Sequence, residues 1–237
     1  TMLLNIHTLR WDEVLLDTFG VPADALPEII QNAQPICCID DKLFGFNSPI
    51  SNIMVDQQAA LFGHMCFVKG DVKATYGTGA FVLMNIGSSP IISSSGFLTT
   101  IAWVLNNTPT YALDGGVYHA GALIDYLIEN LKIIKDPDEA DRIASETMSN
   151  EGVYFVPALA GLSAPYWDTN ARGVIIGLNP SSSYKHIVRA ALEGIAYSVY
   201  DIITGMSNEI NEKLKYLKVD GGLSQSNFLM QFQADIL

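Results

Sequence analysis

Hydrophobic positions along the chain become regular only after about residue 54. Residues 31–53 carry two prolines and scattered polar side chains without a helical or strand period, and they predict a connection. Before them, residues 11–19 predict a short helix that ends at Gly20 and Pro22. The pattern therefore separates a small N-terminal part from a larger, regularly patterned remainder.

Within this remainder, strand patterns come first and then alternate with helical ones. Residues 72–76 and 81–86 are rich in β-branched and aromatic side chains, and Gly77-Thr78-Gly79 between them predicts a hairpin. Further strands are predicted at 97–104 and 216–219, with short buried strands at 153–157 and 174–178. Helices are predicted at 117–131, from 136, at 184–206, and from 224 to the end. This order predicts an α/β fold with a mixed sheet covered by helices.

Composition and charge narrow the possible functions. The chain has 237 residues and is 49% apolar, which excludes a disordered or collagen-like protein. Its 13 Lys and Arg stand against 25 Asp and Glu, a formal net charge of −12. Such a chain repels a nucleic-acid backbone and an anionic membrane surface, so neither is expected as a partner. Three cysteines without a zinc or disulfide pattern predict reduced thiols in a cytoplasmic protein.

The two ends of the sequence suggest a piece of a longer protein. The chain begins at Thr1 rather than at a methionine, and it has no basic segment of a secretory signal. The last predicted helix stops at Leu237 without a cap. We therefore expect the fold to be incomplete at both ends.

Asp56 is the first residue that could carry chemistry. It follows Val55 and opens an apparent helix, where an aspartate commonly caps the backbone. A carboxylate in this place can equally act as a general base that accepts the proton of a substrate hydroxyl. Gln57 beside it would then hydrogen-bond a second polar atom of the substrate. The local pattern leaves both interpretations open.

Two glycine turns form the second group of candidates. Gly77 and Gly79 bracket Thr78, so backbone N–H groups and a hydroxyl can approach an anion, although an ordinary hairpin turn has the same pattern. Phe81, next to this turn, is by default a core residue. A second turn, Gly221-Gly222, lies between a strand and a helix start, where a nucleotide phosphate can bind. The sequence has no P-loop lysine, so bound ATP would be neutralised by backbone amides, hydroxyls and Mg²⁺.

The order and wording of these motifs resemble those of the FGGY carbohydrate kinases, most of all the family members that phosphorylate glycerol. The resemblance covers nearly the whole chain except residues 31–53. The matching strings include TMLLNIHTLRWDE, DQQAALFGHMCF, ATYGTGAFVLMNIG, GVYFVPALAGLSAPYWDTNARGVIIGL, KHIVRAALEGIAYSVYDI and KVDGGLSQSNFLMQFQADIL.

The resemblance implies an actin-like ATPase fold of the ribonuclease-H type, in which ATP and substrate bind between two domains. It implies that residues 1–50 are the tail of the N-terminal domain with the interdomain connection. Residues 51–237 would be most of the C-terminal, ATP-side domain. It also implies that family members are commonly dimers or tetramers, so a homo-oligomer is expected.

The resemblance assigns roles residue by residue. Asp56 takes the place of the catalytic base that acts on glycerol, Gln57 that of a glycerol ligand, and Phe81 that of an aromatic side chain packed on the carbon chain of glycerol. The nucleotide would be contacted by Gly77, Thr78, Gly79, Gly121, Asp125, Gly221, Gly222 and Ser226. ATP and Mg²⁺ are the implied cofactors, and no residue of the chain is assigned as a metal ligand.

The resemblance also indicates what this chain lacks. The first phosphate-binding loop and the side chains that close around glycerol lie in the N-terminal domain of such kinases, so we expect the chain alone to have little or no kinase activity. Two alternatives remain open: a kinase for another polyol or sugar, and a non-catalytic module that binds nucleotide or another protein.

Overall fold

A five-stranded mixed sheet forms the centre of the computed structural model, which describes residues 2–237. The strand order is β11-β5-β6-β8-β7. Only β11 and β5 are parallel, and the other neighbours are antiparallel. The strands are β5 (Val72–Tyr76), β6 (Ala80–Gly87), β7 (Leu98–Leu105), β8 (Thr108–Val117) and β11 (Leu217–Asp220).

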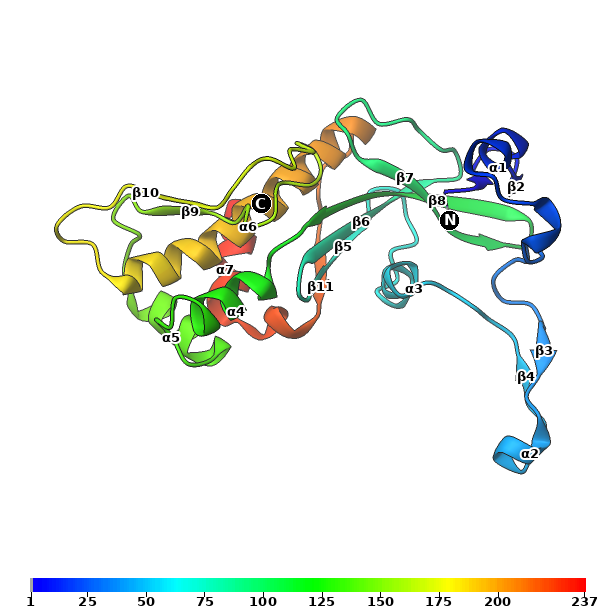
Figure 1. Cartoon of the computed structure of the whole chain (residues 1–237), viewed down its shortest axis with the longest axis horizontal. Coiled ribbons are helices and arrows are strands. Elements are labelled where there is room, and N and C mark those ends of the chain that lie inside the picture. Colours follow the sequence, from blue (N-terminus) through cyan, green and yellow to red (C-terminus); the bar gives the residue numbers. More distant parts are fainter. Residues whose placement is uncertain (1) are drawn as a thin grey trace.

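Helices cover both faces of this sheet, as the sequence predicts (Figure 1). On one face lie α4 (Gly121–Glu129), α5 (Pro137–Glu146), α6 (Tyr184–Ile210) and α7 (Asn227–Ile236), packed around the long helix α6. On the other face lies α3 (Asp56–Gly63), which contacts β5, β6 and β7. A two-stranded ribbon of β9 (Tyr154–Val156) and β10 (Val174–Ile176) packs along α6.

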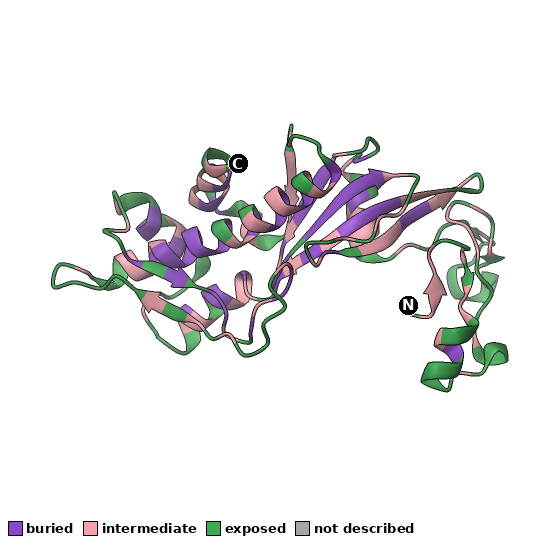
Figure 2. Cartoon of the chain, turned by 90° about the horizontal axis from the view of Figure 1, so that it is seen from above, coloured by how far each residue is buried: buried purple, intermediate pink, exposed green. Residues whose placement is uncertain are grey.

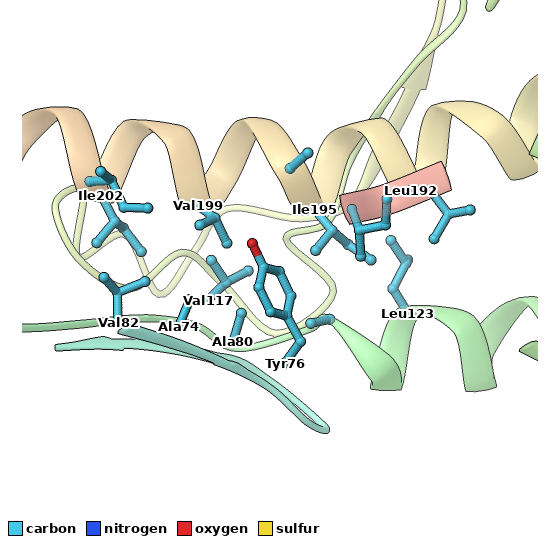
Figure 3. Packing of buried hydrophobic residues seen from close by; sticks show 14 of the residues in the cluster. Ala74, Tyr76, Ala80, Val82, Val117, Leu123, Leu192, Ile195, Val199 and Ile202 are labelled. Atoms are coloured by element: carbon cyan, nitrogen blue, oxygen red, sulfur yellow. The ribbon is translucent and has the colours of Figure 1, made fainter. Parts of the chain in front are cut away.

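The main hydrophobic core lies between α6 and the sheet. Val199 and Ile195 of α6 face Tyr76, Ala80 and their neighbours on the strands (Figure 3). Burial is concentrated along this helix and the middle of the sheet (Figure 2). A second, smaller cluster forms under α3 from Leu61, Cys66, Leu83, Ala102, Trp103 and Ala112. Because successive side chains of a strand point to opposite faces, β6 and β8 contribute to both clusters.

The N-terminal residues form a separate group of small elements at the far end of β7 and β8 (Figure 1). They are β1 (Leu4–Asn5), β2 (Arg10–Trp11), α1 (Glu13–Phe19), a 3₁₀ turn (Ala23–Ala25), β3 (Cys37–Cys38), α2 (Asp41–Phe44) and β4 (Pro49–Ile50). The helix expected at 11–19 is confirmed: Asp12 caps it, and Gly20 ends it in the left-handed conformation. The stretch 31–53 is more than a connection, because β3 pairs with β4 into a small arm.

Three further expectations need correction. The helix predicted at 117–131 begins only at Gly121, since residues 108–117 form the unpredicted strand β8 in the middle of the sheet. The strands at 153–157 and 174–178 are not buried, because the ribbon lays only one face on α6 and leaves Tyr154, Val156, Val174 and Ile176 exposed. The last helix begins at Asn227, after a 3₁₀ turn at Gly222–Gln225.

Candidate active site

The Asp56 carboxylate lies at the first turn of α3 but does not cap it. The capping position is Val55, and no side chain of the described residues makes a cap hydrogen bond there. Asp56 is exposed, and its Oδ1 accepts one hydrogen bond, from the N–H of Gln57 at 2.7 Å. Asp56 is therefore not the capping residue of α3, although it accepts one N–H of the first turn, and most of the acceptor capacity of its carboxylate is open to a ligand.

The buried side chain of Lys73, on β5, binds the Gln57 carboxamide. The Lys73 ammonium donates a short hydrogen bond to Oε1 of Gln57, a second to the Thr75 hydroxyl at 2.9 Å, and a long third one to the Phe81 carbonyl at 3.4 Å. Lys73 has no solvent exposure although it lies in the middle of β5. Its side chain joins α3 to the two strands on either side of the Gly77-Thr78-Gly79 turn.

Strand register places the residues of this face, polar and apolar, in two rows across the sheet. One row is Asp220, Thr75, Phe81 and Gly116, and the next is Lys218, Lys73, Leu83 and Asp114. Side chains paired in this way share a face of the sheet, here the face under α3. The candidate site therefore rests on one end of the sheet.

The charges around Lys73 affect the pKa values of Lys73 itself and of Asp114. Burial lowers the pKa of Lys73 to about 8, while the carboxylates of Asp220, Asp114 and Asp56 oppose this shift. Burial raises the pKa of Asp114, and the Lys73 charge opposes that shift in turn. Asp220 also meets His64, with 3.0 Å between its Oδ2 and Nε2 of the imidazole. One ammonium thus lies among carboxylates from three elements.

Phe81 is not a core residue, contrary to the default expectation. It is 41% exposed, and its ring lies over β8 at Gly116, where an added β-carbon would stand 3.1 Å from the ring. Its neighbour Gly79 has the Val117 carbonyl where a β-carbon would be. The two glycines let an aromatic face lie open to solvent beside the glycine turn.

The Gly77-Thr78-Gly79 turn is braced by the start of α4. The Gly77 carbonyl accepts from the N–H of Gly121 at 2.9 Å, and the Thr78 carbonyl accepts from two neighbouring N–H groups at 3.0 Å each. Thr78 is exposed, and its hydroxyl makes no hydrogen bond within residues 2–237. Gly121 is required here because a β-carbon would lie 2.7 Å from the Gly77 carbonyl oxygen. The turn is thereby rigid, with its hydroxyl available to a ligand.

The second glycine turn reaches the same strand end. Gly221 has φ +89°, and a β-carbon there would lie 2.4 Å from the Tyr76 carbonyl oxygen, whereas Gly222 faces open space. Ser226 is buried and serves as the cap of α7, since its hydroxyl accepts from the N–H of Leu229 at 3.1 Å and donates to Asp141. The Asp141 carboxylate also accepts from the N–H of Phe228 at 2.9 Å. At the start of α7, the N–H groups of Phe228 and Leu229 are thus already engaged. The exposed backbone groups of this turn are those of Gly221 and Gly222.

Asp125 lies one turn after Gly121 on α4. It is exposed and makes no hydrogen bond within the described part of the chain. The structure therefore brings the two glycine turns and Gly121 to one end of β5, with Asp56, Gln57 and Phe81 grouped around Lys73 beside them. Ser226 is engaged in the cap of α7.

Two features of this site escaped the sequence analysis. Lys73 lies in the predicted strand 72–76 without any motif around it, although a lysine in a buried strand is itself a signal, because lysine is almost never buried without partners. No motif singles out His64, whose contact with Asp220 joins the end of α3 to β11. Only the tertiary structure brings these residues together.

Residues 2–237 contain neither a metal-binding cluster nor a membrane-spanning helix. Among residues 2–237, no group of three or more His, Cys, Asp and Glu side chains could hold a metal ion. In the same residues, no helix is both long enough and apolar enough to cross a membrane.

The fold and these loops define an α/β domain of the actin-like ATPase type. Residues 72–237 match the C-terminal domain of the FGGY family of carbohydrate kinases, and residues 1–63 match part of its N-terminal domain. The chain belongs to this family.

Curated relatives and a solved structure agree with this assignment. The chain is 48% identical over 236 residues to a glycerol kinase of Parabacteroides distasonis and 50% identical over 238 residues to one of Pseudothermotoga lettingae. All of this chain and 47% and 48%, respectively, of those proteins are covered. A crystal structure of Plasmodium falciparum glycerol kinase with ADP matches 99% of this chain and 47% of its own, with a TM-score of 0.91 at 38% identity. The chain thus spans about half the length of the relatives it matches.

Proposed function

We propose that this chain carries the base and the nucleotide-side half of a kinase that transfers the γ-phosphoryl group of ATP to glycerol, forming sn-glycerol 3-phosphate. The observation that carries the proposal is the state of Asp56. Its carboxylate is exposed, does not cap its helix, and lies beside Gln57 near the glycine turns. The similarity to glycerol kinases supports glycerol as the acceptor.

In the proposed reaction Asp56 accepts the proton of the attacking hydroxyl. An alcohol is far too weak an acid for an ordinary carboxylate to deprotonate before bond formation. The hydroxyl becomes acidic as its oxygen bonds to phosphorus, so Asp56 first orients it and takes its proton late. Proton transfer of this kind contributes about 10²- to 10⁴-fold, and positioning contributes much of the rest.

The other proposed roles follow the surfaces described above. Gln57 hydrogen-bonds glycerol, and the open ring of Phe81 packs on its carbon chain. The phosphates lie along Gly77, Thr78 and Gly79, and the remainder of the nucleotide lies along Gly121, Asp125, Gly221, Gly222 and Ser226. Ser226 is the weakest member of this set, because its hydroxyl is already engaged at the start of α7.

Mg²⁺ fits this arrangement as a companion of ATP. Protein sites for Mg²⁺ commonly use one or two carboxylates together with substrate phosphates and water, so a cluster of protein ligands is not needed. Asp56 is an exposed carboxylate beside the glycine turns with free acceptor capacity. When bound, the ion would neutralise charge on the transferring phosphoryl group.

We further propose the setting of this activity. We place the domain boundary near residue 50, although the match to the N-terminal domain reaches residue 63, because α3 packs on the sheet of the larger part. Residues 51–237 are then the ATP-side domain, and an N-terminal domain supplies the rest of the substrate cleft. A homo-oligomer in the cytoplasm, where ATP is available, is the state we propose. All three cysteines are free, in keeping with a reducing compartment.

ATP-dependent formation of glycerol 3-phosphate tests the proposal. The assay uses the chain itself and the chain completed with the remaining residues of the Pseudothermotoga lettingae relative. Asp56→Asn should reduce turnover of the active form by at least about 10²-fold, the lower bound for losing a general base. Asp41→Asn is the matched control, since Asp41 is also an exposed acid at the first position of a helix, far from the site.

The outcomes separate the alternatives. Phosphorylation of another polyol or sugar in preference to glycerol would favour a different acceptor on the same site. If neither the completed protein nor its Asp56→Asn variant transfers a phosphoryl group to any acceptor, the result would favour a non-catalytic nucleotide-binding or interaction module.

A further inference from the structure

Lys73 is buried in a way that demands an explanation. Its side chain has no solvent exposure, and among residues 2–237 no carboxylate forms an ion pair with it. Burying a charge is costly unless it is hydrogen-bonded and compensated. The three oxygens near its ammonium come from Gln57, Thr75 and Phe81, and two of these residues belong to the proposed glycerol site.

The chemistry of lysine decides how the Gln57 carboxamide is turned. An ammonium carries three donors and no acceptor, so it can bind only the oxygen of the amide. Oε1 of Gln57 is therefore directed to Lys73, and Nε2 is left as the free end. Without this contact, rotation of the amide group could present either the acceptor oxygen or the donor nitrogen to a ligand.

We propose that Lys73 is a positioning residue, which holds the Gln57 carboxamide by its oxygen and presents its Nε2 donor to a substrate oxygen beside Asp56. The role toward the substrate rests on the proposed function. It gives the site two complementary ends, an acceptor at Asp56 and a donor at Gln57. A polyol, with one hydroxyl that donates and another oxygen that accepts, matches both ends.

The surrounding charges are consistent with a permanent ammonium at neutral pH. Asp56 approaches from α3, Asp114 from β8 and Asp220 from β11, so negative groups compensate Lys73 from three elements. The buried Cys66 thiol is the other titratable group with an effect on Lys73. With its pKa at about 8, Lys73 remains mainly protonated at pH 7.

The chain offers a matched control. Lys218 pairs directly with Lys73 across β11 and β5, so the two side chains share a face and a level of the sheet. Lys218 instead donates to the carbonyls of His64 and Met65, at 2.7 and 3.1 Å. Lys218→Met removes a lysine from the same region without touching Gln57.

The first test needs no substrate. In a ¹⁵N-labelled chain, the Gln57 side-chain amide signals are assigned by their loss in Gln57→Ala. Lys73→Met should move these signals toward the shifts of a freely rotating glutamine side chain, whereas Lys218→Met should leave them in place. Unchanged Gln57 signals in a folded Lys73→Met protein would overturn the proposal. If that variant does not fold, Gln57→Met provides the reciprocal test, since it should move the Lys73 ε-carbon signal.

The second test is a double-mutant cycle in the completed kinase. Lys73→Met should raise KM for glycerol about tenfold, the value of one hydrogen bond to a charged or positioned group, and leave KM for ATP unchanged. In a Gln57→Ala background the same substitution should change KM for glycerol less than twofold. Equal effects in both backgrounds would refute action through Gln57. If the wild type transfers no phosphate to glycerol, the proposed function fails, while the amide signals still decide whether Lys73 orients Gln57.

Discussion

The α-carbon of Gly221 lies so close to Tyr76 that a β-carbon would stand 2.4 Å from the Tyr76 carbonyl oxygen. This contact brings the turn after β11 to the strand end that carries the Gly77-Thr78-Gly79 turn. The two glycine turns therefore form one surface because their backbones meet. Any side chain at Gly221 must push them apart.

This relationship predicts a large difference between two adjacent glycines. Gly221→Ala should lower the free energy of unfolding by about 2–4 kcal/mol, because it adds a backbone clash to a positive φ. Gly222→Ala faces open space and should cost about 1 kcal/mol or less. Denaturant unfolding of both variants measures the difference, and equal stabilities would contradict the close approach.

A buried hydrogen bond between Tyr76 and Gln233 gives a second prediction. The Tyr76 hydroxyl donates to Oε1 of Gln233 at 2.9 Å, and Nε2 of Gln233 is buried with no hydrogen-bond partner in the described part of the chain. Tyr76→Phe leaves the whole carboxamide unsatisfied, so the free energy of unfolding should fall by about 1–3 kcal/mol. Tyr166→Phe is the control, since its exposed hydroxyl contacts Asp201 and its loss should cost within about 0.5 kcal/mol. Thermal and denaturant unfolding measure both losses, and equal stabilities of the two variants would contradict the prediction.

Two ion pairs with the same helical spacing should differ in their contribution to the free energy of unfolding. Arg189–Glu193 on α6 is nearly buried, with side chains 16% and 3% exposed, whereas Arg142–Glu146 on α5 is 56% and 55% exposed. Glu193→Gln leaves a buried guanidinium unpaired and should cost about 2–4 kcal/mol. Glu146→Gln should cost about 0.5 kcal/mol or less.

Unfolding at low and high salt checks this comparison. The small effect at Glu146 should shrink further as salt screens the exposed pair. A Glu193→Gln protein as stable as the wild type would show that the buried pair contributes little.

The pKa of Lys73 predicts a pH-dependent stability. Its pKa is lowered to about 8 in the folded protein, below its ordinary value, so between pH 8 and about 10.5 the unfolded chain binds more protons. The wild type should therefore gain stability relative to Lys73→Met as pH rises through this range, by up to about 1.4 kcal/mol per pH unit. Below pH 8 the difference between the two proteins should be nearly flat.

Urea unfolding of both proteins at matched pH values measures this difference. Using the difference cancels the other groups that titrate in the same range. A difference that stays flat or falls above pH 8 would show that Lys73 is not buried as a charge.

Local patterns predicted those elements that neighbouring residues stabilise by themselves. Asp12 and Gly20 mark both ends of α1, and Asp136 accepts from the Glu139 N–H at the start of α5. The long helix α6 was predicted within a few residues of its end, and Ser183 and His186 cap its start. Such signals lie within a few positions of the backbone groups that they satisfy.

The strand β8 could not be read in this way. It contains Pro109 and the pair Gly115-Gly116, which weaken a strand pattern. The glycines are present because α6 and Phe81 pack against them: a β-carbon at Gly115 would lie 3.0 Å from Ile202 and Met206. The need for glycine at these two positions therefore comes from residues that are distant in the sequence.

The sequence by itself determined the class of fold, the two glycine turns and the interest of Asp56, because periodicity and turn chemistry act over short distances. The resemblance to the FGGY kinases, and no local pattern, added Gly121, Asp125 and Ser226. Only the tertiary structure decided which of them are free to act. The capping position of α3 falls on Val55, so the Asp56 carboxylate is left with one hydrogen bond, from the Gln57 N–H. Phe81 is exposed with Gly116 under its ring, and Ser226 is engaged because Asp141 meets it. Lys73 is buried and directed to Gln57 because α3 packs across β5 and β6, a contact between elements that no local pattern contains.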